Sequence, residues 1–233
     1  MSNPDHNPPV WDAFVEPVVA RCQAKLGQPE GWRNPNGYPD GLALCIVDAI
    51  WSLGANYDAH VVPVLDAYRE IRRAAGGNPN TDGTPELIDA IASCGGGTGF
   101  ADAVRNHQRT SARKTAPLKA EAVDQAAGAL NAEAITTADA FRAAVADDAT
   151  KVAHVWRSVP GQRSSDIGWR YLLLLSGADE VKPDRMVSAF LRDCGVPALP
   201  TRDAVALVRS AARRLEVPAR VLDHAIWLYQ RAL

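Results

Sequence analysis

The sequence predicts an all-α fold, which we expect to be a two-lobed helical bundle. Apolar residues recur at three- and four-residue spacing through most of the 233 residues, the periodicity of helices that bury one face. Valine and isoleucine rarely alternate with polar residues, so strands have almost no pattern to follow. Hydrophobic residues make up 47% of the chain and charged residues 22%. This composition can bury a sizeable core and excludes a disordered chain.

Turn and cap residues divide this pattern into elements. Thr84, Thr137 and Thr201 each precede an acidic residue, which is typical of helix starts because a hydroxyl caps a free N–H and an acid complements the helix dipole. Glycine and proline clusters break the helical period at 35–37, 76–79, 95–97 and 196–197. The predicted helices cover residues 10–25, 41–54, 58–75, 84–94, 99–112, 117–130, 137–147, 148–158, 164–177, 184–194, 201–215 and 217–232.

We expect these helices to form one domain, residues 1–233, with two lobes. One lobe covers approximately residues 40–155. The other combines the N-terminal helix with residues 156–233. The apolar runs are too short to cross a bilayer, and residues 1–9 have no signal-peptide pattern. The sequence therefore predicts a cytoplasmic protein that does not bind membranes and is a monomer.

Composition also argues against several kinds of site. The net charge is −2 and the pI is about 6.2, so nucleic-acid binding would need local basic patches. The four cysteines form no CxxC pair, and the five histidines have no metal-ligand spacing. We therefore predict no metal site and no iron–sulfur cluster. The GxSxG elbow of serine hydrolases and the Walker phosphate loop are also missing.

The segment 159–187, VPGQRSSDIGWRYLLLLSGADEVKPDRMV, carries the most information. A helix ends before it, Pro160-Gly161 makes a tight turn, and a second helix starts near Ser164. A turn that feeds a helix N-terminus points free N–H groups outward, which suits an anionic phosphate. The hairpin is therefore predicted to hold nucleic acid through its phosphate backbone.

Basic residues gather in two parts of the sequence. Together they predict a positive face on an otherwise acidic protein, although surface arginines that are merely solvated are the alternative. The first group flanks the hairpin and the second contains no acid between its ends: Arg157, Arg163 and Arg170; Arg105, Arg109, Arg113 and Lys114.

This segment resembles the helix-hairpin-helix DNA glycosylases, the superfamily of endonuclease III and the alkyladenine and 8-oxoguanine glycosylases. Their hairpin reads roughly LPGxGxxxA, and Val159-Pro160-Gly161 matches the LPG positions. Asp184 falls on the family's catalytic Asp. Segments 42–68 and 222–229 look like the family's early helix pair and its closing helix. The chain departs from the pattern at Arg163, which replaces the second hairpin glycine, and in lacking the cysteine cluster.

The resemblance implies an enzyme that hydrolyses the N-glycosidic bond of a damaged or modified base in DNA, with Asp184 as the catalytic carboxylate. A carboxylate stabilises the oxocarbenium character of the sugar and activates water. Lyase-active members carry lysine at the position of Ser165, so the resemblance implies a monofunctional enzyme. The implied DNA-binding residues are Val159, Gly161, Arg163, Ser164 and Ser165.

A base that leaves the duplex needs aromatic faces to stack on and polar groups that read its edge. Trp51, Asn56, Tyr57 and Trp169 have these side chains and are the predicted base pocket. Tryptophan as core filler is the alternative for Trp51 and Trp169.

The predicted partner is double-stranded DNA with a modified base, so the resemblance also implies a nucleoid-associated protein. No cofactor is predicted, apart from a monovalent ion that the hairpin could hold. The sequence does not say which base is the substrate. Two other functions stay open. One is a non-catalytic helix-hairpin-helix DNA-binding module in which Asp184 only caps a helix. The other is a helical protein–protein adaptor.

Overall fold

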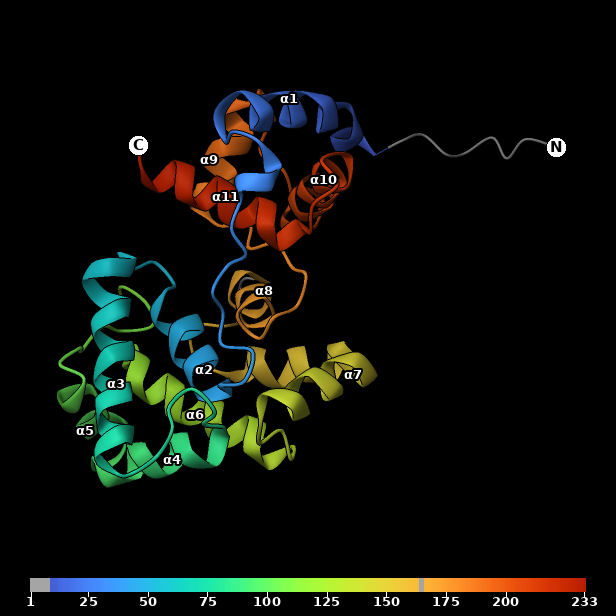
Figure 1. Ribbon diagram of the computed structural model, residues 1–233. Coiled ribbons are helices and arrows are strands. Elements are labelled where there is room, and N and C mark those ends of the chain that lie inside the picture. The colour runs from blue at the N-terminus through green and yellow to red at the C-terminus, as the bar shows by residue number, and fades with distance from the viewer. Residues whose placement is uncertain (1–8, 164–165) are drawn as a thin grey trace. The chain divides into compact units, whose positions relative to one another are not determined.

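The computed structural model describes residues 9–163 and 166–233, and the fold is all-α (Figure 1). The described residues contain no β-strand, only an isolated bridge between Arg109 and Leu118. None of the helices in these ranges is long and apolar enough to span a bilayer. The all-helical prediction is therefore confirmed.

The chain divides into two compact units. Unit 1 contains residues 1–36 and 178–233, and unit 2 contains residues 37–177. The N-terminal helix belongs to the same unit as the C-terminal segment, which is how the two lobes were predicted. Residues 156–177, however, belong to unit 2 rather than to the lobe predicted for them, because α8 (Asp166–Leu175) packs on α2 (Leu42–Trp51) and α7 (Ala138–Ser158).

Unit 2 is built around α2, whose residues are all buried. This helix contacts α4, α6 and α8, and α6 also packs against α4 and α5. A helix that is apolar on every side is stable only when neighbours cover all of it. The elements of unit 2 are α2 (Leu42–Trp51), the π-helical turn η3 (Tyr57–Val61), α3 (Val62–Ala74), α4 (Thr84–Ser93), α5 (Gly96–Ala103), α6 (Lys119–Ala132), α7 (Ala138–Ser158) and α8 (Asp166–Leu175).

Unit 2 contains two helix boundaries for which the sequence made specific predictions, the end of α5 and a break within α7. The predicted helix 99–112 is wrong beyond Ala103, because Arg105 adopts a left-handed φ of 53° and Asn106 N donates to Ala101 O at 2.9 Å, which ends the helix. The predicted boundary between 147 and 148 lies inside α7 at a kink, where Asp148 has a non-helical φ of −146°. The Asp148 carboxylate then caps the second half of α7.

One of the three predicted threonine caps is confirmed. The Thr137 hydroxyl accepts from Ala140 N at 3.1 Å at the start of α7. Thr84 is instead buried within the first turn of α4, and its hydroxyl donates to Ile135 O at 3.2 Å. Thr201 is the first residue of α10 (Thr201–Arg214), whose N-cap is Pro200 and which has no side-chain cap.

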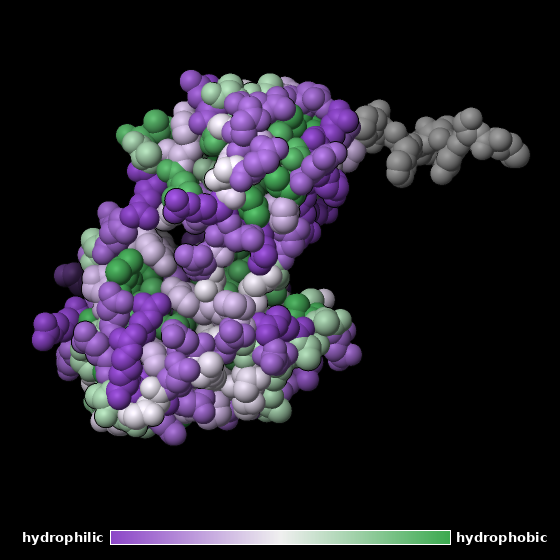
Figure 2. All heavy atoms as spheres, in the orientation of Figure 1, coloured by the Kyte–Doolittle hydropathy of each residue, from purple (hydrophilic) through white to green (hydrophobic). Residues whose placement is uncertain are grey.

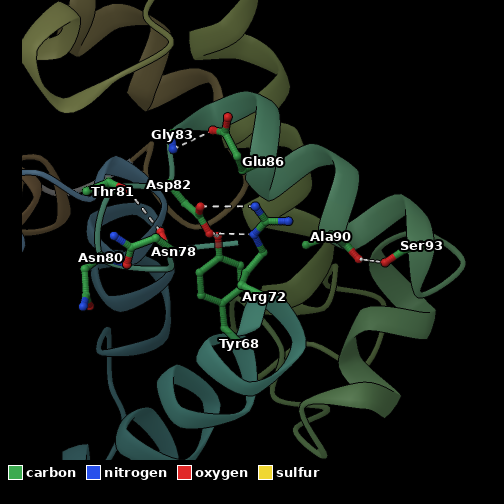
Figure 3. Close-up of polar contacts among 10 residues, drawn as sticks. All are labelled: Tyr68, Arg72, Asn78, Asn80, Thr81, Asp82, Gly83, Glu86, Ala90 and Ser93. Carbon is green, nitrogen blue, oxygen red and sulfur yellow. Dashed lines mark hydrogen bonds and ion pairs between the residues drawn. The ribbon is translucent and has the colours of Figure 1, made fainter. Parts of the chain in front are cut away.

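A buried ion pair fixes the loop before α4 (Figure 3). Asp82 is 3% exposed and accepts from Tyr68 Oη at 2.9 Å and from Arg72 Nε at 2.6 Å. Both donors come from α3, and Figure 3 shows their side chains converging on the carboxylate. Glu86 accepts from Gly83 N at 2.8 Å and caps α4. The loop is therefore tied to both α3 and α4.

Unit 1 joins the two ends of the chain around its own apolar core. Helix α1 packs against α10, and α9 and α10 both contact α11. Phe190 and Leu207 are fully buried in this core beside Cys22 of α1. The elements of unit 1 are the 3₁₀ turns η1 (Val10–Phe14) and η2 (Pro29–Gly31), α1 (Val15–Lys25), α9 (Arg185–Asp193), α10 (Thr201–Arg214) and α11 (Ala219–Arg231).

The face of the molecule in Figure 2 is mostly hydrophilic, with apolar residues scattered among polar ones. In the described part of the chain, the large hydrophobic residues that are exposed are Val10, Leu228 and Leu233. The apolar faces of the described helices are therefore mostly buried.

Candidate functional site

The predicted hairpin is a tight turn between α7 and α8. Helix α7 ends at Ser158, and Gln162 N donates to Val159 O at 3.1 Å to close the turn. Gly161 lies in the turn with a φ of 84°, a conformation that L-residues rarely adopt. The predicted DNA-binding residues Ser164 and Ser165 lie outside the described residues.

The charges beside the hairpin differ in their surroundings. Arg157 Nη2 lies 2.5 Å from Asp166 Oδ1, so this arginine is neutralised by the first residue of α8. Among the described residues, the exposed Arg163 has only a long contact, from its Nη2 to Ser158 O at 3.4 Å. Of these two arginines, Arg163 therefore keeps its charge available to a phosphate.

The second basic group lies next to the hairpin. A Cβ built on Gly161 would be 3.0 Å from Thr110 Cβ, so the loop between α5 and α6 packs directly on the turn. This loop, residues 104–118, carries the second basic group, whose members are all exposed: Arg105, Arg109, Arg113 and Lys114. Sequence separates these residues from the hairpin, and the fold of unit 2 brings them together.

Asp184 belongs to unit 1 and is the N-cap of α9. Its Oδ1 accepts from Met186 N at 2.8 Å and from Val187 N at 3.3 Å. Its Oδ2 lies 3.8 Å from Lys182 Nζ, and the Asp184 side chain is 18% exposed. One oxygen therefore caps the helix while the other faces an ammonium group.

A second carboxyl group supports the segment that enters α9. Asp223 of α11 accepts from Lys182 N at 2.9 Å and is 6% exposed. Burial, with a contribution from the nearby charge of Asp184, raises the pKa of Asp223 to about 8. Asp223 thus holds the backbone two residues before Asp184. The sequence analysis did not single out Asp223, although it lies in the closing-helix segment 222–229.

Two of the predicted pocket residues are core residues. Trp51 is fully buried and packs edge-to-face on Phe100, with ring centroids 6.3 Å apart. Trp169 is 7% exposed and packs against Phe141 at 6.0 Å. A stacking base needs an open ring face. The structure therefore corrects the prediction for Trp51 and Trp169, because their rings are used in packing.

The other two pocket residues stand at the start of the π-helical turn η3. Asn56 is exposed, and its Oδ1 caps the turn by accepting from Ala59 N at 3.1 Å. Tyr57 is half-buried, and its hydroxyl donates to Asp48 Oδ2 at 2.8 Å. Short π-helical segments are rare and often lie at functional sites. Asn56 and Tyr57 are the pocket residues that keep surface exposure.

Tyr57 is part of a buried carboxylate cluster that the sequence analysis missed. Asp48 is fully buried in α2 and also accepts from Tyr38 Oη at 3.0 Å, and Tyr171 of α8 is hydrogen-bonded to it as well. Burial, followed by the charge of Asp48, raises the pKa of all three phenols. The hydroxyls therefore stay protonated and donate. A single acid within the apolar run LALCIVDAIW was the available signal.

A buried lysine supports the same end of α2. Lys119 Nζ donates to Trp51 O at 2.7 Å and to Leu53 O at 2.8 Å, and lies 3.4 Å from Gln108 Oε1. Burial lowers the pKa of Lys119 to about 8. These contacts connect the end of α2 to the basic loop 104–118, so both are held by one amine.

Within residues 9–163 and 166–233, no group of three or more histidine, cysteine or acidic side chains could hold a metal ion. Among curated proteins and among solved structures, none matches this chain. One family model does match, over residues 16–231, and its description is Domain of unknown function (DUF8548). Since this match covers nearly all of both units, the chain belongs to the DUF8548 family.

Proposed function

We propose that this protein is a monofunctional DNA glycosylase that hydrolyses the N-glycosidic bond of a damaged or modified base. The observation that carries the proposal is the turn at Val159–Gln162 between α7 and α8, with a left-handed glycine and a basic loop packed on it. A helix N-terminus preceded by such a turn favours a phosphate. The hairpin binds the DNA backbone and reads no base edge, so this contact is independent of sequence.

In the proposed reaction, Asp184 supplies the negative charge. As the bond from C1′ of the sugar to the base breaks, the base leaves with the bonding electrons and the sugar develops oxocarbenium character. The Asp184 carboxylate stabilises this cation and accepts a proton from the attacking water. Its Oδ2 is not used in capping α9, so capping and catalysis are compatible in one side chain.

The proposal includes hydrolysis without strand cleavage. A lyase needs an amine that forms a Schiff base with the sugar. Lyase-active helix-hairpin-helix DNA glycosylases carry lysine at one hairpin position, and this chain has Ser165 there. Lys182 is the amine nearest to Asp184 in sequence. Its Nζ lies 3.8 Å from Asp184 Oδ2, so the ammonium group is next to the proposed catalytic carboxylate.

The test is base release from duplexes that each carry one alkylated, oxidised or deaminated base. The protein is incubated with the duplex, and alkali then cuts the strand at abasic sites. Asp184→Asn should lower the rate roughly a hundredfold or more, the cost of removing a preorganised electrostatic group, with unchanged DNA affinity. Asparagine is an equally good N-cap, so α9 stays folded. Asp193→Asn, at the exposed end of α9, is the matched control.

A non-catalytic DNA-binding module is the second candidate, and it is favoured by the two hydrogen bonds through which Asp184 caps α9. The same assay separates the two functions. Binding to duplex DNA without base release from any substrate supports the module. Release that depends on Asp184 supports the glycosylase.

A further inference from the structure

The longest stretch of unit 2 without an acidic residue is 103–120, between Asp102 and Glu121. It holds five basic residues in a chain whose net charge is −2. Lys119 is buried and satisfied by backbone carbonyls. The other four are exposed, so the charge is concentrated on the surface of the loop 104–118.

These cations are not neutralised by any of the described residues. In the described part of the chain, Arg105, Arg113 and Lys114 make no ion pair and no side-chain hydrogen bond, and Arg109 donates to a backbone carbonyl, Ala116 O, at 2.6 Å. Elsewhere, surface arginines lie beside carboxylates; examples are Arg69, Arg142, Arg157, Arg202, Arg209 and Arg214. The loop is therefore a surface with its positive charge available to a partner.

The loop is also held in a fixed shape. Thr110 N donates to Pro117 O at 2.9 Å and Lys119 N donates to Gln108 O at 2.8 Å, so its two arms are paired. The base of the loop is connected to η3, because Asn106 Nδ2 donates to His60 O at 3.3 Å. A preorganised loop loses less conformational entropy when it binds. The exposed tip, residues 111–115, carries Arg113 and Lys114.

We propose that the tip of this loop is a second phosphate-binding element, which contacts the sugar–phosphate backbone of duplex DNA beside the hairpin. The 3.0 Å approach of a Gly161 Cβ to Thr110 Cβ makes the two elements one continuous surface of unit 2. Arg163 of the hairpin and Arg113 and Lys114 of the loop then neutralise neighbouring phosphates. Lysine and arginine contacts of this kind give affinity without sequence preference.

This inference rests on the DNA-binding part of the proposed function and not on base release. The probe is a fluorescein-labelled 20-base-pair duplex with no modified base, titrated with the full chain between 50 and 200 mM salt. Arg113→Ala/Lys114→Ala should weaken binding roughly tenfold or more at 0.1 M salt, since affinity varies with salt to a power of about −0.9 for each phosphate contact. The slope of log affinity against log salt should flatten by about one to two units for the same reason.

Two control variants make the test specific. Arg33→Ala/Arg73→Ala removes the same charge at two exposed sites and should leave affinity within about twofold, because the chain's bulk charge contributes little at these salt concentrations. Arg73 lies in the last turn of α3, about 20 Å along the helix from η3 at 1.5 Å per residue. Arg113→Lys/Lys114→Arg keeps the charge and should retain the wild-type salt slope.

An equal loss in both alanine pairs would assign the effect to bulk charge and overturn the proposal. The proposal would also fail if Arg113→Ala/Lys114→Ala kept wild-type DNA affinity while Gly161→Ala weakened binding. It would fail as well if the protein bound phosphatidylserine vesicles in place of DNA. If the duplex binds through the loop but no base is released from any substrate, the loop proposal stands and the glycosylase proposal fails. The two failures are therefore distinguishable.

Discussion

Replacing Asp48 with alanine should be among the most damaging single substitutions in unit 2. The carboxylate is fully buried and accepts from Tyr38 and Tyr57 at 3.0 and 2.8 Å, with Tyr171 as a third partner. Alanine would leave three phenol hydroxyls without this acceptor, and each such loss costs about 1–3 kcal/mol. The three tyrosines are half-buried and some of the hydroxyls will find water, so we expect a total loss of about 3–5 kcal/mol.

The measurement is urea unfolding of the full chain, followed by circular dichroism. Asp48→Asn should lower the free energy of unfolding by less than half of the loss expected for Asp48→Ala. The reason is that the amide oxygen can accept from Tyr38 and Tyr57, whose hydroxyls both donate to Oδ2 of Asp48. Asp89→Ala removes an exposed acid from α4 and should change the free energy of unfolding by less than about 0.5 kcal/mol. An Asp48→Ala variant within about 1 kcal/mol of wild type would refute the reasoning, because that is below the cost of even one buried donor left without a partner.

Three further predictions concern the hairpin, the product and the pH dependence. Gly161→Ala should weaken binding to two unrelated duplexes by the same factor in fluorescence polarisation, because a Cβ at φ 84° meets Thr110 and displaces the turn; a loss confined to one sequence would contradict backbone binding. Borohydride should trap no protein–DNA adduct, and an adduct that disappears in Lys182→Ala would show a lyase. Burial raises the pKa of Asp223 from 3.8 to about 8, so the stabilisation from its bound proton is complete below pH 4 and is lost as the pH rises to 8. Asp223→Asn should therefore flatten the pH dependence of the unfolding free energy between pH 4 and 8, and an unchanged slope in urea unfolding would contradict the burial of this carboxyl group.

Local signals in the sequence were sufficient to predict most helices. The break between 147 and 148 appears as the kink at Asp148, and the turn at Pro160-Gly161 lies between α7 and α8. Both depend on residues close together in the chain, where cap and turn preferences act directly. The helix predicted through 112 fails for the opposite reason. Arg105 and Asn106 end α5 through backbone geometry that ordinary helix-forming residues do not signal.

The candidate site depended more on distant contacts and was predicted less completely. Trp51 stands in a run of ten residues that are apolar on nearly every side, which indicates a fully covered helix and leaves no face for a ligand. Asp48 was visible as the one acid in that run, but its partners Tyr38 and Tyr171 come from a loop and from α8. No periodicity connects such residues. One sequence therefore identifies a buried acid more easily than the donors that satisfy it.

The proposed phosphate contacts and the proposed catalytic carboxylate belong to different units, and this makes the competing functions separable. The hairpin and the basic loop are in unit 2, whereas Asp184 and its support from Asp223 are in unit 1. Phosphate contacts should therefore control affinity and its salt dependence, while the unit 1 carboxylate should control the rate of base release at saturating DNA. A glycosylase requires both effects: Arg113→Ala/Lys114→Ala should change the affinity, and Asp184→Asn should change the rate of base release. A DNA-binding module requires the first effect alone, so Asp184→Asn would then behave as a harmless change of one N-cap for another.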